Sequence, residues 1–166
     1  AAIKDPNPVI FLEPKKIYRS FKEEVPEDSY EIELGKANVV QEGTDITLVS
    51  WGAMTKLTKD TAEKLKEENI NCEIIDLRTL WPLDMETITK SVDKTGRCVI
   101  IQEATQACSL SSEITAQVQE RSALHLKAPV ARVTSPNLPF PHFALENYFL
   151  PSEKRIINEV KKTLDF

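Results

Sequence analysis

The stretch that decides the fold begins with the apolar run Ile46-Thr-Leu-Val-Ser-Trp51, and similar apolar runs recur further along the chain. Each apolar run is separated from the next by a more polar segment long enough for a helix. The runs are Ile46–Trp51, Cys72–Leu77, Cys98–Ile101 and Val130–Val133. Parallel strands cannot be joined by tight hairpins, because each crossover needs a dozen or more residues and is usually helical. The pattern therefore predicts an α/β domain with a mostly parallel sheet between helical layers.

Amphipathic spacing predicts a helix in each crossover and one more at the C-terminus. The first covers roughly residues 55–69 and the third roughly residues 110–124, while the last follows Pro151. The second begins at Asp84, a residue type that caps helix N-termini, and ends near Gly96. The predicted order is strand, helix, strand, helix, strand, helix, strand, then a proline-rich loop and a final helix.

Residues 1–30 differ from the rest of the chain. Val9–Leu12 predicts a buried strand between two proline-containing turns, and the charged stretch 15–30 predicts an exposed linker. One strand and a linker do not make a domain. We therefore interpret residues 1–30 as the trailing strand and linker of a missing N-terminal domain, and 31–166 as the domain itself. Within the latter, Asn38–Gln41 is a candidate for an additional short strand.

Composition excludes two classes of partner. The net charge of −5 is spread along the 166 residues, so no concentrated basic face is available for nucleic acid. The apolar runs are only a few residues long, far short of the ~20 that span a bilayer. The three cysteines lack Cys-x-x-Cys spacing, and Cys72 and Cys98 open predicted buried strands, which is typical of a protein from a reducing compartment.

The predicted carboxyl ends of the strands, where sheets of this kind bind ligands, carry few reactive groups. Gly52 is compatible with an anion at a helix N-terminus, but an ordinary tight turn is favoured. Asp76 and Glu103 are placed for acid–base chemistry, yet such carboxylates more often cap helices or pair with a cation such as Arg78. These residues do not define an active site.

A cysteine nucleophile is the other chemical alternative. Cys108 lies just ahead of a predicted helix, a position that activates thiols, and His125 or His142 is available as a base. No third group that would orient the base is evident. Metal binding by the two histidines is disfavoured because 17 residues separate them and no further ligand pattern exists. The chain alone thus shows no convincing catalytic residues.

Several segments of the sequence resemble those of one protein family. They are Asp5–Lys15 (DPNPVIFLEPK), Tyr18-Arg19, Glu42–Gly52 (EGTDITLVSWG), Glu73–Asp84 (EIIDLRTLWPLD), Lys94–Arg97 (KTGR) and Pro139–His142 (PFPH). In this order and spacing they resemble the beta subunits of the thiamine-diphosphate-dependent 2-oxoacid dehydrogenases. The likeness is judged closest to the branched-chain 2-oxoisovalerate type, with pyruvate dehydrogenase beta next.

The resemblance implies a fold and a division of labour. The chain corresponds to the C-terminal half of the subunit, a transketolase C-terminal-like domain with a three-layer α/β/α fold and a five-stranded sheet containing one antiparallel strand. In that family the alpha subunit holds the thiamine diphosphate and Mg, and the N-terminal half of beta completes the active site. The resemblance therefore implies that this fragment has no catalytic or cofactor-binding residues and is inactive alone.

Two local features follow from the same resemblance. Asp5, Asn7 and the carbonyl of Ala2 align with a loop that coordinates a structural potassium ion in branched-chain members, so we expect a partial metal site there. The loop 105–110 departs from the family, which shows Pro-x-Thr-Gly-Gly-Phe after the Glu-Ala pair. This chain has Cys108 and a serine at the glycine positions.

The role implied for the domain is assembly. It would pair with a second beta subunit in an α2β2 heterotetramer, contact the alpha subunit, and offer Phe166 to the lipoyl acyltransferase core of the complex; a frayed C-terminus is the alternative for Phe166. The whole enzyme would oxidatively decarboxylate branched-chain 2-oxoacids and acylate lipoamide. The alternatives are pyruvate as substrate, or a stand-alone interaction module. The implied location is the cytoplasm of a prokaryote or the mitochondrial matrix of a eukaryote.

Overall fold

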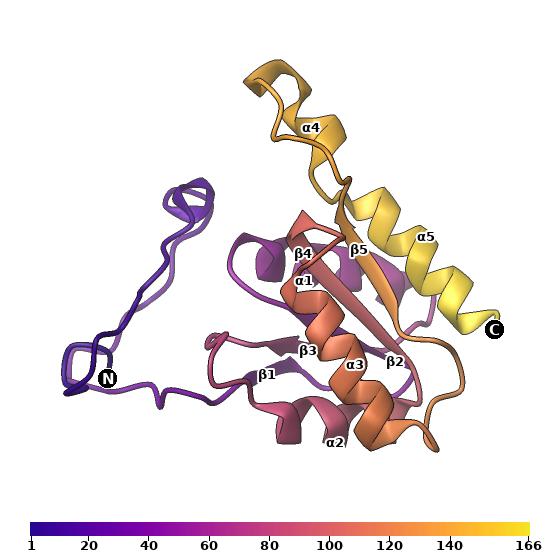
Figure 1. Ribbon diagram of the computed structural model, residues 1–166, viewed down its shortest axis with the longest axis horizontal. Coiled ribbons are helices and arrows are strands. Elements are labelled where there is room, and N and C mark those ends of the chain that lie inside the picture. The colour runs from indigo at the N-terminus through magenta and orange to yellow at the C-terminus, as the bar shows by residue number, and fades with distance from the viewer.

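Five strands form one sheet in the order β1-β3-β2-β4-β5 in the computed structural model, which describes residues 1–166 (Figure 1). The strands are β1 (Asn38–Gln41), β2 (Ile46–Ser50), β3 (Cys72–Asp76), β4 (Cys98–Thr105) and β5 (Ala131–Ser135). The main helices are α1 (Ala53–Glu67), α2 (Met85–Thr95), α3 (Leu110–Ser122) and α5 (Glu153–Leu164). The three-layer α/β/α prediction is confirmed, including the order of strands and helices.

The register explains why the central strands are apolar throughout. In β2, Leu48 lies opposite Ile74 of β3 on one side and opposite Val99 of β4 on the other, and both pairings are parallel. Strand β5 continues the parallel arrangement beyond β4. Strand β1 pairs with β3 in the antiparallel sense, with a register shift between Val39 and Gln41. The additional antiparallel strand is therefore confirmed.

Two hydrophobic cores lie on opposite faces of the sheet. Helices α1 and α5 cover one face, where Ala62 and Leu65 of α1 and Ile156 of α5 are fully buried against the strands. Helices α2 and α3 cover the other face, where Ile88 and Ile114 are equally buried. Because each fully buried aliphatic side chain stabilises the fold by about 1.5–3 kcal/mol, the two cores hold the layers together.

Capping residues fix the ends of α2. The Asp84 carboxylate accepts hydrogen bonds from the backbone N–H of Thr87 at 3.1 Å and from that of Ala37 at 3.0 Å. It therefore caps the helix and also anchors the segment that leads into β1. Gly96 ends the helix with φ of 74°, a left-handed conformation that glycine adopts without steric cost. Both predicted ends of this helix are confirmed.

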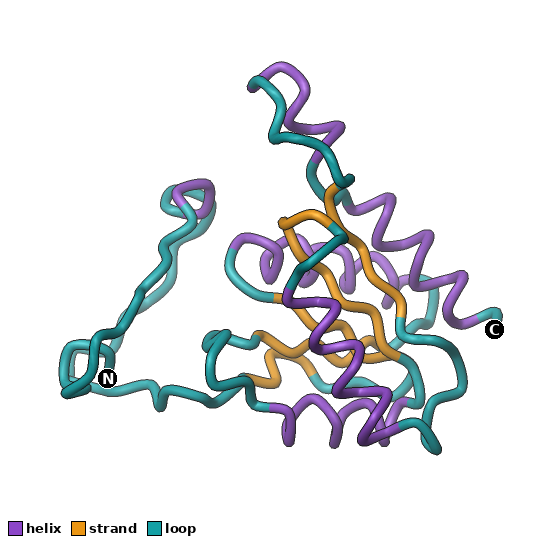
Figure 2. Tube along the Cα trace, in the orientation of Figure 1, coloured by secondary structure: helices purple, strands orange, loops and turns teal.

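Residues 1–34 form an extended arm that runs outside the body of the domain and contacts it again around Ile17 (Figures 1 and 2). Its two halves run back along each other, and Lys4 contacts Glu31 near the base. Only a short 3-10 helix, η1 (Lys15–Ile17), interrupts the irregular backbone. The predicted strand Val9–Leu12 is wrong: these residues are irregular and exposed, because no neighbouring strand is present to accept their backbone hydrogen bonds.

The proline-rich connection between β5 and α5 projects from the carboxyl edge of the sheet (Figure 1). It contains two short helices that the sequence did not predict, η2 (Phe143–Leu145) and α4 (Glu146–Phe149). The rings of Phe140 and Phe149 meet edge to face, 5.3 Å apart, and hold this excursion together. No helix of the chain combines the length and apolar character needed to cross a membrane.

Candidate functional site

The carboxyl ends of β2 and β3 bring together the first group of candidate residues. Thr55 donates to the carboxylate of Asp76 at 3.2 Å, and the Arg78 guanidinium lies 3.8 Å from the same carboxylate. The ordinary role predicted for Asp76, pairing with an arginine, is confirmed. Gly52 has φ of 56°, and Pro14 of the arm lies against it, 3.6 Å from where a β-carbon would stand. Pro14 of the arm therefore lies beside the position considered for an anion, although Gly52 stays exposed.

The loop after β4 is held by its neighbours. The buried Gln102 donates to the carbonyl of Thr105 at 2.8 Å and accepts from the N–H of Ser111 at 3.0 Å. Arg132 donates to the carbonyl of Gln106 at 3.2 Å. Glu103 is exposed at the base of this loop and has no ion-pair partner, and its backbone carbonyl accepts from the hydroxyl of Ser135 at 2.7 Å. The side chains of Gln102 on β4 and Arg132 on β5 thus hold this loop.

The structure does not assemble a cysteine-based site. Cys108 is exposed, with φ of 50°, and directly precedes Ser109 at the start of α3. His125 contacts Asp93 of α2 at 3.3 Å, and His142 is exposed ahead of η2. Because neither histidine contacts Cys108, no base is placed to activate the thiol.

The predicted potassium residues lie in one tight turn at the start of the arm. The Asp5 carboxylate accepts from the backbone N–H of Asn7 at 2.8 Å and from its amide at 3.0 Å. These two side chains are therefore adjacent, as a shared site requires, while the Asp5 N–H is bonded to the carbonyl of Ala1. No cluster of three or more histidine, cysteine or acidic side chains is present for a metal. Potassium binding by Asp5, Asn7 and the Ala2 carbonyl stays a prediction.

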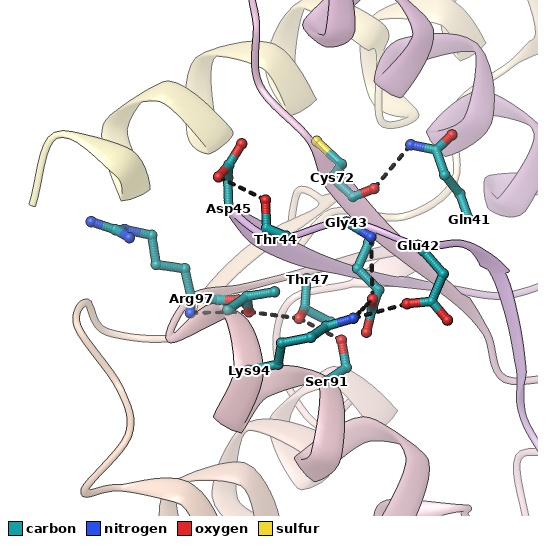
Figure 3. Close-up of polar contacts among 12 residues, drawn as sticks. Gln41, Glu42, Gly43, Thr44, Asp45, Thr47, Cys72, Ser91, Lys94 and Arg97 are labelled. Carbon is teal, nitrogen blue, oxygen red and sulfur yellow. Dashed lines mark hydrogen bonds and ion pairs between the residues drawn. The ribbon is translucent and has the colours of Figure 1, made fainter.

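The most concentrated group of polar contacts lies at the opposite, amino end of the sheet (Figure 3). The side chain of Glu73, only 4% exposed, pairs with Lys94 of α2 and accepts from the N–H of Gly43 at 3.2 Å. Lys94 also contacts Glu42 at 2.9 Å. Beside them, the Thr47 hydroxyl bonds to the hydroxyls of its neighbours Ser91 and Thr95, at 2.7 and 2.8 Å. We call these residues the polar cluster.

The electrostatics of the polar cluster stabilise both of its charges. Burial opposes ionisation of Glu73, but the hydrogen bonds from Lys94, Ser91 and Gly43 outweigh it and hold the pKa of its carboxyl below the ordinary value. Hydrogen bonds to Glu73 and Glu42 raise the pKa of Lys94. A β-carbon on Gly43 would collide with the backbone of β3, so the turn requires glycine. The cluster ties the β1–β2 turn to β3 and α2, which is a structural role.

Sequence reasoning missed the polar cluster. The available signal was a glutamate inside an otherwise apolar strand, at Glu73, together with a lysine in the last turn of the following helix. The two side chains lie 21 residues apart, so their meeting becomes visible only once α2 is placed across the sheet.

Two shallow cavities lie on the surface of the body. The first, of about 390 Å³, lies at the N-terminal end of α2 and includes Lys36, Trp81 and Arg121. The second, of about 320 Å³, lies beside Phe166 and includes Leu126 and Lys127. Trp81 is 81% exposed and Phe166 76% exposed. Exposed aromatic side chains beside a cavity are typical of contact surfaces for other proteins.

Comparison with known proteins identifies the family of the domain. Residues 35–156 match the family model for the transketolase C-terminal domain, and the chain belongs to this family. A solved structure described as a split-gene transketolase, an inactive beta4 tetramer, superposes with a TM-score of 0.72. It is 28% identical, and the match covers 86% of this chain and 46% of that one.

Curated relatives refine the comparison. The beta subunit of the pyruvate dehydrogenase E1 component is 46% identical in Staphylococcus epidermidis and 44% identical in Bacillus subtilis. Each match covers all of this chain but 51% of the relative, so the chain spans about half the length of these proteins. The predicted resemblance to 2-oxoacid dehydrogenase beta subunits is confirmed. These relatives are pyruvate dehydrogenase subunits, so they do not support the branched-chain type that the resemblance in the sequence had placed first.

Proposed function

We propose that this chain is the C-terminal domain of the beta subunit of a 2-oxoacid dehydrogenase, in which it serves assembly. The observation that carries the proposal is the 46% identity to a pyruvate dehydrogenase beta subunit over all 166 residues. The absence of a joined nucleophile, base and orienting group on the chain supports a role outside the chemistry. Thiamine diphosphate and Mg would then be bound by other parts of the enzyme.

Pyruvate is the substrate that the relatives favour. The names of these relatives supply this support. The native polypeptide that contains this sequence, isolated with its partners, is assayed for decarboxylation of pyruvate and of 2-oxoisovalerate. We expect at least tenfold faster turnover of pyruvate. Preference for the branched substrate would restore the branched-chain assignment, and inactivity toward both would overturn the proposed enzyme.

The division of the subunit is part of the same proposal. Residues 1–30 would be the trailing segment and linker of a preceding domain that binds the cofactor's pyrimidine ring. Exposed apolar side chains on the arm support this, since Ile10 is 86% and Phe11 73% exposed. Intact-mass measurement of the native polypeptide distinguishes a two-domain subunit from a stand-alone interaction module. A native mass of 18.8 kDa would favour the module.

The partial potassium site is tested in the complete subunit. Asp5 and Asn7, with the Ala2 carbonyl, would contribute oxygen donors that other residues complete. We expect Asp5→Ala to lower the thermal midpoint more in potassium buffer than in sodium buffer. An equal effect in the two buffers would remove Asp5 from an ion site and leave it as a residue of the local turn.

Phe166 is the proposed contact for the lipoyl acyltransferase core. Removing the last four residues would be a poor test, because Thr163 is buried and its carbonyl accepts from Arg97. The substitution Phe166→Ala changes only the exposed ring. We expect at least tenfold weaker capture of the core by the heterotetramer, with unchanged pyruvate decarboxylation. Tyr148→Ala, on an equally exposed aromatic residue of α4, is the matched control.

A further inference from the structure

The arm contacts the body again at the short helix η1. Ile17, the last residue of η1, packs against the hydrophobic core on the side of the sheet that α1 and α5 cover. Pro14, just before η1, stands 3.6 Å from where a β-carbon on Gly52 would lie. Lys16 lies 3.7 Å from Glu146 at the start of α4. The η1 segment therefore occupies the corner between the start of α1 and α4 (Figure 1).

The apolar and charged contacts of η1 differ in their burial. Pro14 and Ile17 are half-buried, whereas the two lysines between them are exposed. Residues three apart lie on the same side of a 3-10 helix, so this spacing turns one apolar side of the segment toward the body. In the ion pair, the side chain of Lys16 is 57% exposed and that of Glu146 25% exposed. Because water screens such a pair, the apolar side supplies most of the attraction.

The backbone of η1 is too short to be stable without the body. Three hydrogen bonds hold the turn: Ile17 N–H to the Pro14 carbonyl at 3.2 Å, Tyr18 N–H to the Lys15 carbonyl at 3.3 Å, and Ser20 N–H to the Ile17 carbonyl at 3.1 Å. A helix of three residues does not repay the cost of nucleation in water. The formation of this turn therefore depends on its contact with the body.

We propose that residues 14–17 form a latch between the arm and the body. Docking of Ile17 on the core folds η1 and fastens the arm beside the start of α1. Undocking unfolds η1 and releases the arm in the same step. The apolar contact holds the latch closed, and the pair of Lys16 with Glu146 contributes little.

A closed latch shortens the reach of the arm. An arm that is anchored only at residue 35 could carry residue 1 about 115 Å away when fully extended. Anchored at residue 14, it could carry residue 1 only about 45 Å away. Because effective concentration falls as roughly the −3/2 power of tether length, the latch would raise that of a preceding domain about fourfold at the body. This consequence alone rests on the proposed function.

The first experiment measures hydrogen exchange of the Ile17, Tyr18 and Ser20 amides by NMR in the 166-residue chain. The matched control is a synthetic peptide of residues 12–21, which has the same sequence without the body. We expect exchange about tenfold slower in the chain than in the peptide, because docking protects the three hydrogen bonds. Equal rates would overturn the latch. Rates that change when the protein is diluted would place Ile17 on another copy, which also overturns it.

Substitution of the docked side chain tests whether it folds η1. Ile17→Asp places a charge against the core and should return all three amides to the rates of the peptide, while the amides of β2 stay protected. Ile17→Val retains most of the apolar area and should keep most of the protection. Ile10→Asp makes the same change at an exposed position of the arm and should alter none of the three rates. Slow exchange that persists in Ile17→Asp would contradict the proposal.

The contribution of charge is measured separately. Lys16→Gln removes the ion pair with Glu146 and should speed exchange of the three amides by less than about twofold. Salt at about 0.5 M, which screens the same pair, should have an equally small effect. A larger loss of protection in Lys16→Gln than in Ile17→Asp would show that charge holds the arm, against the proposal. None of these measurements involves substrate, cofactor or the alpha subunit, so failure of the latch would leave the proposed function standing.

Discussion

The body of the domain and its arm both contain apolar runs, yet the side chains of these runs have opposite environments. In the body, Ile74 and Leu48 are fully buried between helical layers. In the arm, Ile10 and Phe11 face solvent. Ile17 is the arm residue whose apolar side chain packs against the core. The difference teaches that apolar content alone does not fold a segment; a second layer must be present to cover it. The run Val9–Leu12 of the arm has the composition of an interior strand without the surroundings of one.

The largest effect on stability is expected when an apolar side chain is truncated in the body, compared with the same truncation in the arm. Ile74→Ala should lower the free energy of unfolding by about 4 kcal/mol, because it opens a cavity at the centre of the sheet. Ile10→Ala should change it by less than about 0.5 kcal/mol, since the side chain is already hydrated. Urea denaturation of both variants measures the contrast. Similar losses for the two would mean that the arm packs as tightly as the body.

A smaller effect is expected at the polar cluster. Lys94→Met should cost about 2 kcal/mol, because the buried Glu73 carboxylate then loses its cation. The matched control is Lys66→Met on α1, whose lysine is exposed and unpaired, and it should be close to neutral. Urea denaturation at neutral pH is the measurement. A neutral Lys94→Met variant would show that solvent already compensates Glu73.

The same cluster predicts part of the acid sensitivity of the body. The pKa of Glu73 is lower in the folded protein than its ordinary value of 4.5, so its contribution is complete above that value. It is lost as the pH falls from there through the folded pKa. Glu73→Gln should therefore flatten the decline of unfolding free energy over this window. An unchanged slope, measured by urea titration at several pH values, would assign the acid sensitivity to other carboxyls.

The smallest effect is expected in the loop after β4. Cys108 adopts a left-handed conformation that costs a non-glycine residue about 1–2 kcal/mol, while glycine adds backbone entropy to the unfolded chain. Cys108→Gly should therefore gain about 0.5 kcal/mol on balance. Cys108→Ala retains the strain and should gain nothing. Thermal unfolding of the two variants separates these outcomes, and equal midpoints would contradict the strain argument.

Sequence reasoning located what depends on local pattern. The apolar run Ile46–Trp51, the cap at Asp84 and the glycine stop at Gly96 each follow from rules that act within a few residues. The structure confirms a strand at Ile46–Ser50 and both ends of α2. It failed at Val9–Leu12, where an apolar run predicts a strand only if a neighbouring strand exists. Contacts between residues far apart in the sequence are equally hard to predict, because a local pattern does not show which neighbour will be present.

The candidate site shows that limit more clearly. Burial of Cys72 and Cys98 was predicted, and burial raises the pKa of each thiol to about 12, so both are inert at neutral pH. The pairing of Glu73 with Lys94 was not predicted, because it depends on how α2 crosses the sheet. Neither was the Trp81 cavity, which unites residues from three separate segments.

The irregular register of β1 affects how readily a foreign strand can add to the edge of the sheet. This strand forms one border of the sheet, and the shift between Val39 and Gln41 spoils its outward row of backbone donors and acceptors. Such an irregularity hinders the alignment of a foreign strand along this border. The β1 border is therefore a poorer template than a straight one for the continuous β-structure of amyloid-like growth.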